Sequence, residues 1–266
     1  MLTNRFVEEN FHIPKLKLIE IYPLVPFLLS HERMTCLDVG ANIGLWCEAF
    51  LTTFGPKTER YYAFEPMSGN VQKFRDRMEN HLADGDTAIS LENMCVGADE
   101  RTVEIHFDNL TTTLASVANR ESDLGHKTVS LANSQEMQQV SIDTFAQEHG
   151  IDKIHMLKID VEGYEKDVMD GCKKLFAEKR IQNVFFEFGT HQAVQGQTFQ
   201  AFFEHLTTNG FSIYRSFRGK NYFGLNKINH YDPVFEPTEK TVDMYLATLS
   251  EPSDAYRGPR VVGQIN

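Results

Sequence analysis

The chain has 266 residues, of which 41% are hydrophobic and 24% are charged. This balance is typical of a globular protein, and a chain of this length buries enough surface to fold without disulfides or structural metals. The formal net charge of −11 argues against general nucleic-acid binding, which depends on an excess of Lys and Arg.

The chain has four cysteines: Cys36, Cys47, Cys95 and Cys172. None forms a CxxC pair or lies near paired histidines, so we expect buried, reduced thiols, as in a cytoplasmic protein. The apolar residues 18–29 are interrupted by Glu20, Pro23 and Pro26 and are too short to span a bilayer. Because no basic stretch precedes an apolar core, as it would in a secretory leader, we predict cytoplasmic localisation without a membrane span.

The chain divides into a short lead-in and one main domain. Residues 1–33 are polar and then apolar, and we expect a partly helical segment that packs on the main domain or on a partner. Residues 34–266 form the main domain. Apolar runs predict strands at 34–39, 60–64, 88–96, 102–107, 155–159, 183–188, 211–217 and 241–249. Helical spacing predicts helices at 43–54, 68–82, 140–150, 163–179 and 196–208.

Strands that alternate with helices predict an α/β fold with a doubly wound, mainly parallel sheet of seven strands, covered by helices on both faces. One strand is expected to be antiparallel, because no helix separates the last two strands. The polar residues 108–139 exceed an ordinary connection, so we expect a flexible loop or a cover over a site. Ligands of such sheets bind beyond the carboxyl ends of the strands, where the strand order reverses.

The loop between the first strand and the first helix carries a glycine motif. Gly40 allows a sharp turn, and Gly44 allows a close approach of helix and sheet. Their G-x-x-x-G spacing differs from the dinucleotide pattern G-x-G-x-x-G, and Asn42 stands where a glycine would approach a pyrophosphate. The loop therefore indicates a nucleoside-type ligand without phosphate, and it disfavours the alternative of a dinucleotide-dependent oxidoreductase.

Residues at neighbouring strand ends complete the predicted ligand site. Glu65 is placed to accept both ribose hydroxyls, and Asp38 is placed to meet an amino group, directly or through water. The loop amides can meet a carboxylate at the helix N-terminus. Residues 93–96 are expected to border the adenine, with plain core as the alternative. The predicted cofactor-binding residues are Asp38, Gly40, Ala41, Asn42, Gly44, Glu65, Pro66, Asn93, Met94, Cys95, Val96 and Asp160.

Acidic residues also follow two later strands. Asp160 and Glu162 follow one predicted strand, and Glu187 ends the next, with His191 close behind. Buried carboxylates are costly without partners or a task, so we expect these four residues to converge on one cleft as catalytic groups. The alternatives are that Asp160 and Glu162 order their loop by accepting backbone N–H bonds, and that His191 is a surface residue.

Taken together, several motifs resemble the FkbM family of methyltransferases. The matching blocks are Leu37–Gly44, Ala63–Pro66, Ser141–Phe145 and Leu157–Glu165, with support from Phe185–Glu187. The resemblance spans residues 34–190 and leaves the lead-in and the residues after 195 uncovered. It implies a Rossmann-like class I methyltransferase fold that uses S-adenosyl-L-methionine. It also implies O-methylation, commonly of a hydroxyl on a sugar, a glycan or a related natural product.

A hydroxyl acceptor needs help to lose its proton during in-line methyl transfer. His191, with an ordinary pKa of about 6.5, is our first candidate base, and Asp160 or Glu162 could serve instead. In a second scheme, Asp160 and Glu187 would hold a divalent cation such as magnesium that polarises the hydroxyl, although the sequence shows no tight ligand cluster. Lys158 is expected to pair with one of the carboxylates or to orient the substrate.

The expected partner is a carbohydrate or another small-molecule hydroxyl acceptor, rather than a nucleic acid or a membrane. Two alternatives stay open. One is the same chemistry on a lipid, polyketide or peptide acceptor, and the other is a module that binds S-adenosylmethionine without turnover. Aromatic and polar residues at 218–223 suit stacking on a sugar ring, with an ordinary surface hairpin as the alternative.

Overall fold

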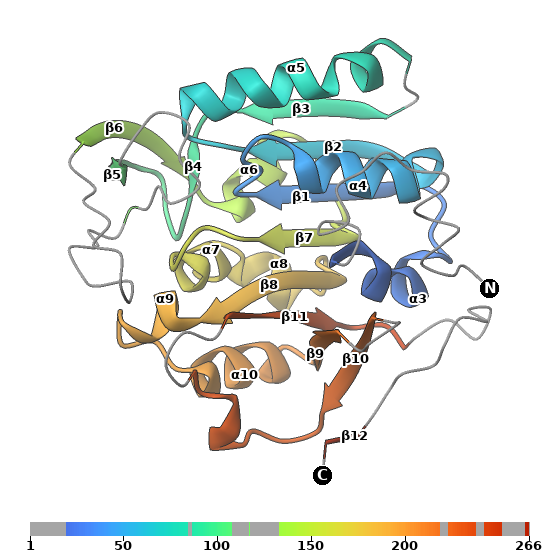
Figure 1. Ribbon diagram of the computed structural model, residues 1–266, viewed down its shortest axis with the longest axis vertical. Helices are drawn as coiled ribbons and strands as arrows, with labels where there is room; N and C mark the ends of the chain where they lie inside the picture. The colour runs from blue at the N-terminus through green and yellow to red at the C-terminus, as the bar shows by residue number, and fades with distance from the viewer. Residues whose placement is uncertain are drawn as a thin grey trace.

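The computed structural model describes residues 20–84, 87–107, 117, 133–218, 223–237, 242–251 and 264–265. It contains a nine-stranded sheet with helices on both faces and a separate three-stranded sheet (Figure 1). Residues 1–19 of the lead-in lie outside the described residues. The rest of it forms η1 (Tyr22–Leu24) and α3 (Val25–Leu28), and Phe27 packs on Tyr214 with ring centroids 5.3 Å apart. Within the described part of the chain, no helix is both long and apolar enough to cross a membrane.

Parallel strands form one half of the large sheet. They are β1 (Met34–Val39), β2 (Thr58–Phe64), β3 (Ala88–Glu92), β7 (Met156–Ile159) and β8 (Asn183–Gly189). The other strands are β9 (Ser212–Arg218), β10 (Phe223–Ile228), β11 (Val242–Thr248) and β12 (Gln264–Ile265). The order is β12-β10-β9-β11-β8-β7-β1-β2-β3. After β1 the chain first builds outward through β2 and β3 and later returns through β7 and β8, so a switch point lies between β1 and β7.

The predicted α/β class with a mainly parallel sheet is confirmed. The sheet has nine strands rather than seven, because β10 pairs with β9 as a hairpin and β12 pairs with β10. The expectation of one antiparallel strand is also too low. β11 runs antiparallel to both β8 and β9, and β10 runs antiparallel to β9. β10 lies in residues 218–239, which the sequence pattern presents as a connection, and β12 lies beyond the last predicted strand.

Helices cover both faces of the large sheet and bury two separate apolar cores. Successive side chains of a strand point to opposite faces, so Cys36 packs in one core and Leu37 in the other. Trp46, Phe50 and Phe54, which recur at four-residue spacing in the helix after β1, are buried. The covering helices are α4 (Leu45–Phe54) and α5 (Ser68–Asp84) on one face, and α6 (Ile142–Glu148), α7 (Glu165–Asp170), α8 (Lys173–Ala177) and α10 (Phe199–Thr208) on the other. Shorter helices are η2 (Gly55–Lys57), α9 (Thr190–Ala193) and η3 (Pro233–Phe235). All four cysteines are buried and free, as predicted.

The single helix expected over residues 163–179 is two helices, α7 and α8, with Gly171 between them. The backbone of Gly171 contacts the carbonyl group of Gly97, and a Cβ at Gly171 would lie 2.1 Å from that oxygen. The carboxylate of Asp143 accepts the backbone N–H of Lys174 at 2.8 Å at the start of α8. Because the apolar spacing continues across the break, the sequence pattern predicts one helix.

The separate sheet consists of β4 (Cys95–Val96), β6 (Asn133–Val140) and β5 (Arg101–Phe107), in that order. It lies beyond the carboxyl ends of β1 and β7 (Figure 1). Two predictions are corrected here. The run 88–96 is divided between the two sheets at Asn93, whose amide donates to the carbonyl oxygen of Glu65 at 2.9 Å. Residues 133–139, expected in a loop, pair with β5, and their largely polar sequence gave no strand signal. Apart from residue 117, the rest of that expected loop lies outside the described residues.

Candidate active site

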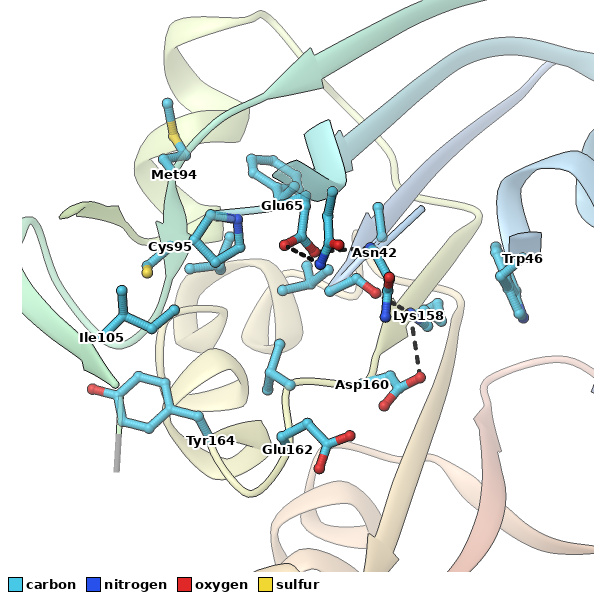
Figure 2. Close-up of a pocket in the computed structure, with 18 of the residues that line it drawn as sticks. Asn42, Trp46, Glu65, Met94, Cys95, Ile105, Lys158, Asp160, Glu162 and Tyr164 are labelled. Carbon is cyan, nitrogen blue, oxygen red and sulfur yellow. Dashed lines mark hydrogen bonds and ion pairs between the residues drawn. The ribbon is translucent and has the colours of Figure 1, made fainter. Parts of the chain in front are cut away.

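A cavity of about 380 Å³ lies at the switch point, beyond the carboxyl ends of β1, β2, β7 and β8. Figure 2 shows Glu65 and Met94 on one side of it and Asp160 and Glu162 on another. The predicted site residues in its wall are Gly40, Ala41, Asn42, Glu65, Pro66, Met94, Cys95, Val96, Asp160, Glu162 and Glu187. The predicted residues outside the wall are Asp38, Gly44, Asn93 and His191. The residues expected for a nucleoside ligand and those expected for an acceptor therefore share one cavity.

Close backbone contacts shape the loop after β1. Gly40 has a φ of 78°, and a Cβ there would lie 1.9 Å from the backbone oxygen of Asp160, so only glycine fits. Asn42 has a φ of 51°, in the left-handed region that asparagine tolerates better than most residues. At Gly44, with a φ of 81°, a Cβ would meet the ring of Phe74 at 2.9 Å. The two glycines therefore allow the close contacts that place the loop between β7 and α5.

Three backbone amides of this loop are engaged within the protein. Gly40 and Ala41 both donate to the carbonyl oxygen of Phe64, at 3.0 and 2.9 Å. Asn42 donates to Oε2 of Glu65 at 2.8 Å. These three amides therefore bind the end of β2, and the contact of loop amides with a ligand carboxylate stays a prediction for the start of α4, where Leu45 and Trp46 line the cavity.

Glu65 is a buried carboxylate held by N–H donors. Its Oε1 accepts hydrogen bonds from the backbone of Met67 at 2.9 Å and from the amide of Asn70 at 3.2 Å. Its Oε2 accepts the single bond from Asn42. Burial raises the pKa of Glu65, although these hydrogen bonds oppose the rise. A carboxylate has about four acceptor positions, so Oε2 retains capacity for a hydroxyl group of a ligand.

Asp38, expected to meet an amino group, is fully buried and contacts other parts of the protein instead. Its Oδ2 accepts from the hydroxyl of Tyr61 at 2.8 Å, and its Oδ1 lies 3.0 Å from Nζ of Lys158. Lys158 Nζ also donates to the carbonyl oxygen of Gly40 at 2.7 Å and lies 3.6 Å from Oδ2 of Asp160. Burial lowers the pKa of Lys158, but the charges of Asp38 and Asp160 outweigh burial and hold it above its ordinary value. Asp38 thus fixes Lys158, which connects the loop after β1 to Asp160.

Three carboxylates, on Asp160, Glu162 and Glu187, lie in the cavity wall close enough to influence one another. Burial raises the pKa of Glu187 to about 9, and the charges of Asp160 and Glu162 add to the rise. Both effects favour the protonated form of Glu187. His191 is outside the wall, on α9, but its Nε2 lies 3.5 Å from Oε2 of Glu162. It therefore contacts a residue of the cavity wall without lining the cavity itself.

The loop that carries Glu162 is ordered by a carboxylate outside the cavity. Glu165 Oε1 accepts the backbone N–H groups of Val161 and Gly163 at 3.0 and 3.2 Å. Its Oε2 accepts from the amide of Gln192 at 2.6 Å, which ties the loop to the helix after β8. Glu162 is held in this turn with a φ of 58°. The loop-ordering role considered for the cavity carboxylates is thus filled by Glu165.

Other cavity residues were not predicted. Trp46, assigned from its spacing to the core, also lines the cavity, as do Tyr164, Ile105 and Val117. The hydroxyl of Tyr164 accepts from the guanidinium of Arg101 at 2.8 Å, which joins the loop after β7 to β5. Tyr164 stands beside the acidic motif and could have been found from it. The contacts of Ile105 and Val117 depend on how the small sheet, in whose core they pack, folds over the cavity, which no local pattern specifies.

Two sequence-based alternatives gain no support. Among the residues that the structure describes, no group of three or more His, Cys, Asp or Glu side chains is arranged to hold a metal ion. The pair considered for magnesium, Asp160 and Glu187, is therefore not arranged with a third such side chain to hold a metal ion. The aromatic segment considered for stacking on a sugar falls largely on residues 219–222, outside the described residues.

Comparison with known proteins places the chain in a family. Its sequence matches the family described as the methyltransferase FkbM domain over residues 38–213. No curated protein matches the chain. The FkbM resemblance drawn from the strand-end motifs is confirmed, and the match extends beyond the residues that carried it.

Solved structures share the fold. The methyltransferase FkbM from Methylobacillus flagellatus KT superposes with a TM-score of 0.54 at 13% identity, covering 91% of this chain and 50% of that one. This chain therefore spans about half the length of that protein. Weaker likenesses are precorrin-6y C5,15-methyltransferase from Geobacter metallireducens GS-15 (TM-score 0.42, 11% identity, 86% and 87% coverage) and M. capricolum TrmK in complex with S-adenosyl-homocysteine (TM-score 0.44, 10% identity, 93% and 74% coverage).

Proposed function

Because the chain belongs to the FkbM methyltransferase family, we propose that it transfers a methyl group from S-adenosyl-L-methionine to a hydroxyl group of a sugar or glycan. One observation carries the proposal. A single cavity holds the glycine-shaped loop and Glu65 together with the carboxylates of Asp160, Glu162 and Glu187. The donor and the acceptor oxygen can therefore meet in one enclosed space, as in-line transfer requires.

The cavity fits a phosphate-free nucleoside. Its volume of about 380 Å³ is in the range of small-ligand sites. Lys158 is the single Lys or Arg among the lining residues that the structure describes, and its charge is paired with Asp38. A pyrophosphate would find no free cation there, whereas Oε2 of Glu65 suits a ribose hydroxyl. Met94, Cys95 and Val96 supply an apolar wall for the adenine ring of the nucleoside.

S-adenosyl-L-methionine, when bound, supplies a methyl group on a positively charged sulfur. The residues of the chain must orient the acceptor hydroxyl and accept its proton. The cavity carboxylates of Asp160, Glu162 and Glu187 are the candidate acceptors of that proton, and His191 can take part through Glu162. Carboxylates also accept hydrogen bonds from several hydroxyl groups at once, which favours a polyhydroxyl acceptor.

The test is transfer of labelled methyl groups from S-adenosylmethionine to a panel of acceptors. The panel contains neutral sugars, sugar phosphates, a lipid, a peptide and RNA. We expect label in neutral sugars, and we expect loss of labelling in Asp160→Asn. Labelling should persist in Glu148→Gln, which removes an exposed carboxylate of α6. Labelling of the lipid or the peptide alone would contradict a sugar acceptor and indicate that other class of acceptor. Donor binding without transfer to any acceptor would favour a binding module.

A further inference from the structure

Glu187 lies among like charges. It stands on β8 between β7 and β11 and lines the cavity. The carboxylates of Asp160 and Glu162, after β7, and of Glu165, at the start of α7, all act on it. Lys158 of β7 opposes them, but its ammonium group is already 3.0 Å from the buried carboxylate of β1.

The remaining neighbours of Glu187 do not change this balance. Met244 stands opposite it on β11. The next residue of that strand, Asp243, is bound to Arg215 of β9 at 2.7 Å. On α9, His191 lies beside Glu162. The largest electrostatic influences on Glu187 are therefore three carboxylates, which oppose its ionisation, and the paired ammonium group of Lys158, which favours it.

Burial and the neighbouring carboxylates that line the same cavity favour the protonated form of Glu187 while no cation occupies the cavity. A positive charge that enters the same cavity acts in the opposite direction, because a nearby opposite charge favours ionisation. The protonation of Glu187 is therefore coupled to the charge of whatever the cavity binds.

Resting on the proposed function, we propose that Glu187 is the catalytic base and that binding of the cationic methyl donor ionises it. The ionised Glu187 takes the proton of the acceptor hydroxyl as the acceptor oxygen forms its bond to the methyl carbon. The carbon–sulfur bond breaks, and its electron pair stays on sulfur. The positive charge on sulfur is lost as a proton arrives on Glu187, so the net charge in the cavity is unchanged by the transfer.

The coupling is tested by calorimetry of ligand binding near neutral pH, in buffers that differ in ionisation enthalpy. The number of protons released is compared for S-adenosylmethionine, S-adenosylhomocysteine, which is neutral at sulfur, and sinefungin, which carries an amine in place of the methylated sulfur. In the wild-type protein we expect S-adenosylmethionine and sinefungin to release about one proton more than S-adenosylhomocysteine.

Matched variants assign the proton. Glu187→Gln should abolish the extra release, and Glu148→Gln should retain it. Proton exchange by the ligand's own amino group is common to both variants. The difference in proton release between the two variants therefore reports on Glu187 alone. Asp160→Asn should reduce the release, since it removes one charge that keeps Glu187 protonated. If Glu187→Gln does not fold, infrared difference spectra of the wild-type protein take its place. The carbonyl band of a protonated carboxyl group should disappear on binding S-adenosylmethionine and persist with S-adenosylhomocysteine.

The outcomes separate the two proposals. Equal proton release for the three ligands, or an extra release that survives in Glu187→Gln, would overturn the role of Glu187 and leave the methyltransferase proposal intact. Failure of the wild-type protein to bind either S-adenosylmethionine or S-adenosylhomocysteine would overturn the proposed function itself.

Discussion

Glu65, which is buried, and Glu187, which is half-buried, are carboxylates near the ends of two strands that open into one cavity, but their surroundings differ in kind. Glu65 accepts three hydrogen bonds from N–H groups, from Met67, Asn70 and Asn42. Glu187 is instead surrounded mainly by other carboxylates. Burial raises the pKa of both, but the hydrogen bonds oppose the rise at Glu65, whereas neighbouring negative charges increase it at Glu187.

The comparison indicates that the surroundings of the two glutamates, and not their residue type, determine which role each is suited to. N–H donors fix the orientation of Glu65, which suits an acceptor of hydrogen bonds from a bound ligand. Like charges keep a proton on Glu187 that a cation can displace, which suits proton transfer. We therefore assign donor binding to Glu65 and proton transfer to Glu187, and each assignment can be broken separately.

The largest effect is expected from Glu187→Gln. Glutamine keeps the size of the side chain but cannot take a proton, so kcat should fall by about 10²–10⁴-fold. Affinity for S-adenosylhomocysteine should stay close to the wild-type value, because the ligand is neutral at sulfur. Steady-state kinetics with a neutral sugar, beside calorimetry, checks both. A wild-type kcat in this variant would end the contrast between the two carboxylates.

A large loss of stability is expected from Lys158→Met, because this ammonium group connects the two sides of the cavity. The substitution leaves Asp38 charged, buried and without its cation. We expect the free energy of unfolding, measured with urea, to fall by about 3–5 kcal/mol. The double variant Lys158→Met with Asp38→Asn should regain part of the loss. If the double variant is no more stable than the single one, the unpaired charge is not the cause.

A smaller effect, on binding rather than on rate, is expected from Glu65→Gln. The variant loses the charge that strengthens hydrogen bonds from ligand hydroxyls and presents an N–H to one of its present donors. The Kd for S-adenosylhomocysteine should rise by about 10–100-fold, while kcat at saturating donor should change little. The contrast would be reversed if Glu65→Gln lowered kcat and Glu187→Gln weakened binding.

The smallest effect concerns pH and the stability of the free protein. The folded pKa of Glu187, about 9, lies above its ordinary value of 4.5. Its contribution to stability is therefore fully present below 4.5 and is lost as pH rises through about 9. Urea unfolding between neutral and alkaline pH should show stability falling with pH, and the fall should be shallower in Glu187→Gln. If stability falls with pH at the same slope in both proteins, Glu187 is not the group that causes the fall.

Local patterns predicted the positions where side chains meet the cavity. Glu65, Asp160 and Glu187 could be found because each follows an apolar strand, and parallel strands end at one edge of the sheet. Gly40 was found because its turn needs a glycine, although the close contact with Asp160 became visible only in the structure. The fold class followed from the alternation of predicted strands and helices along the chain.

The errors arose where a residue's partner is distant in sequence. Asp38 looks available for a ligand until Tyr61 and Lys158 are placed on it. The backbone amides of Gly40 and Ala41 look equally available, but both donate to the carbonyl oxygen of Phe64 at the end of β2. β6 is nearly all polar and is a strand because it pairs with β5, so no apolar run could reveal it.

The most direct measurement is a crystal structure of the chain soaked with S-adenosylhomocysteine and a neutral sugar. We predict a ribose hydroxyl hydrogen-bonded to Oε2 of Glu65 and a sugar hydroxyl within hydrogen-bonding distance of the Glu187 carboxyl group. Electron density for the nucleoside outside this cavity, or a sugar bound away from Glu187, would contradict the account.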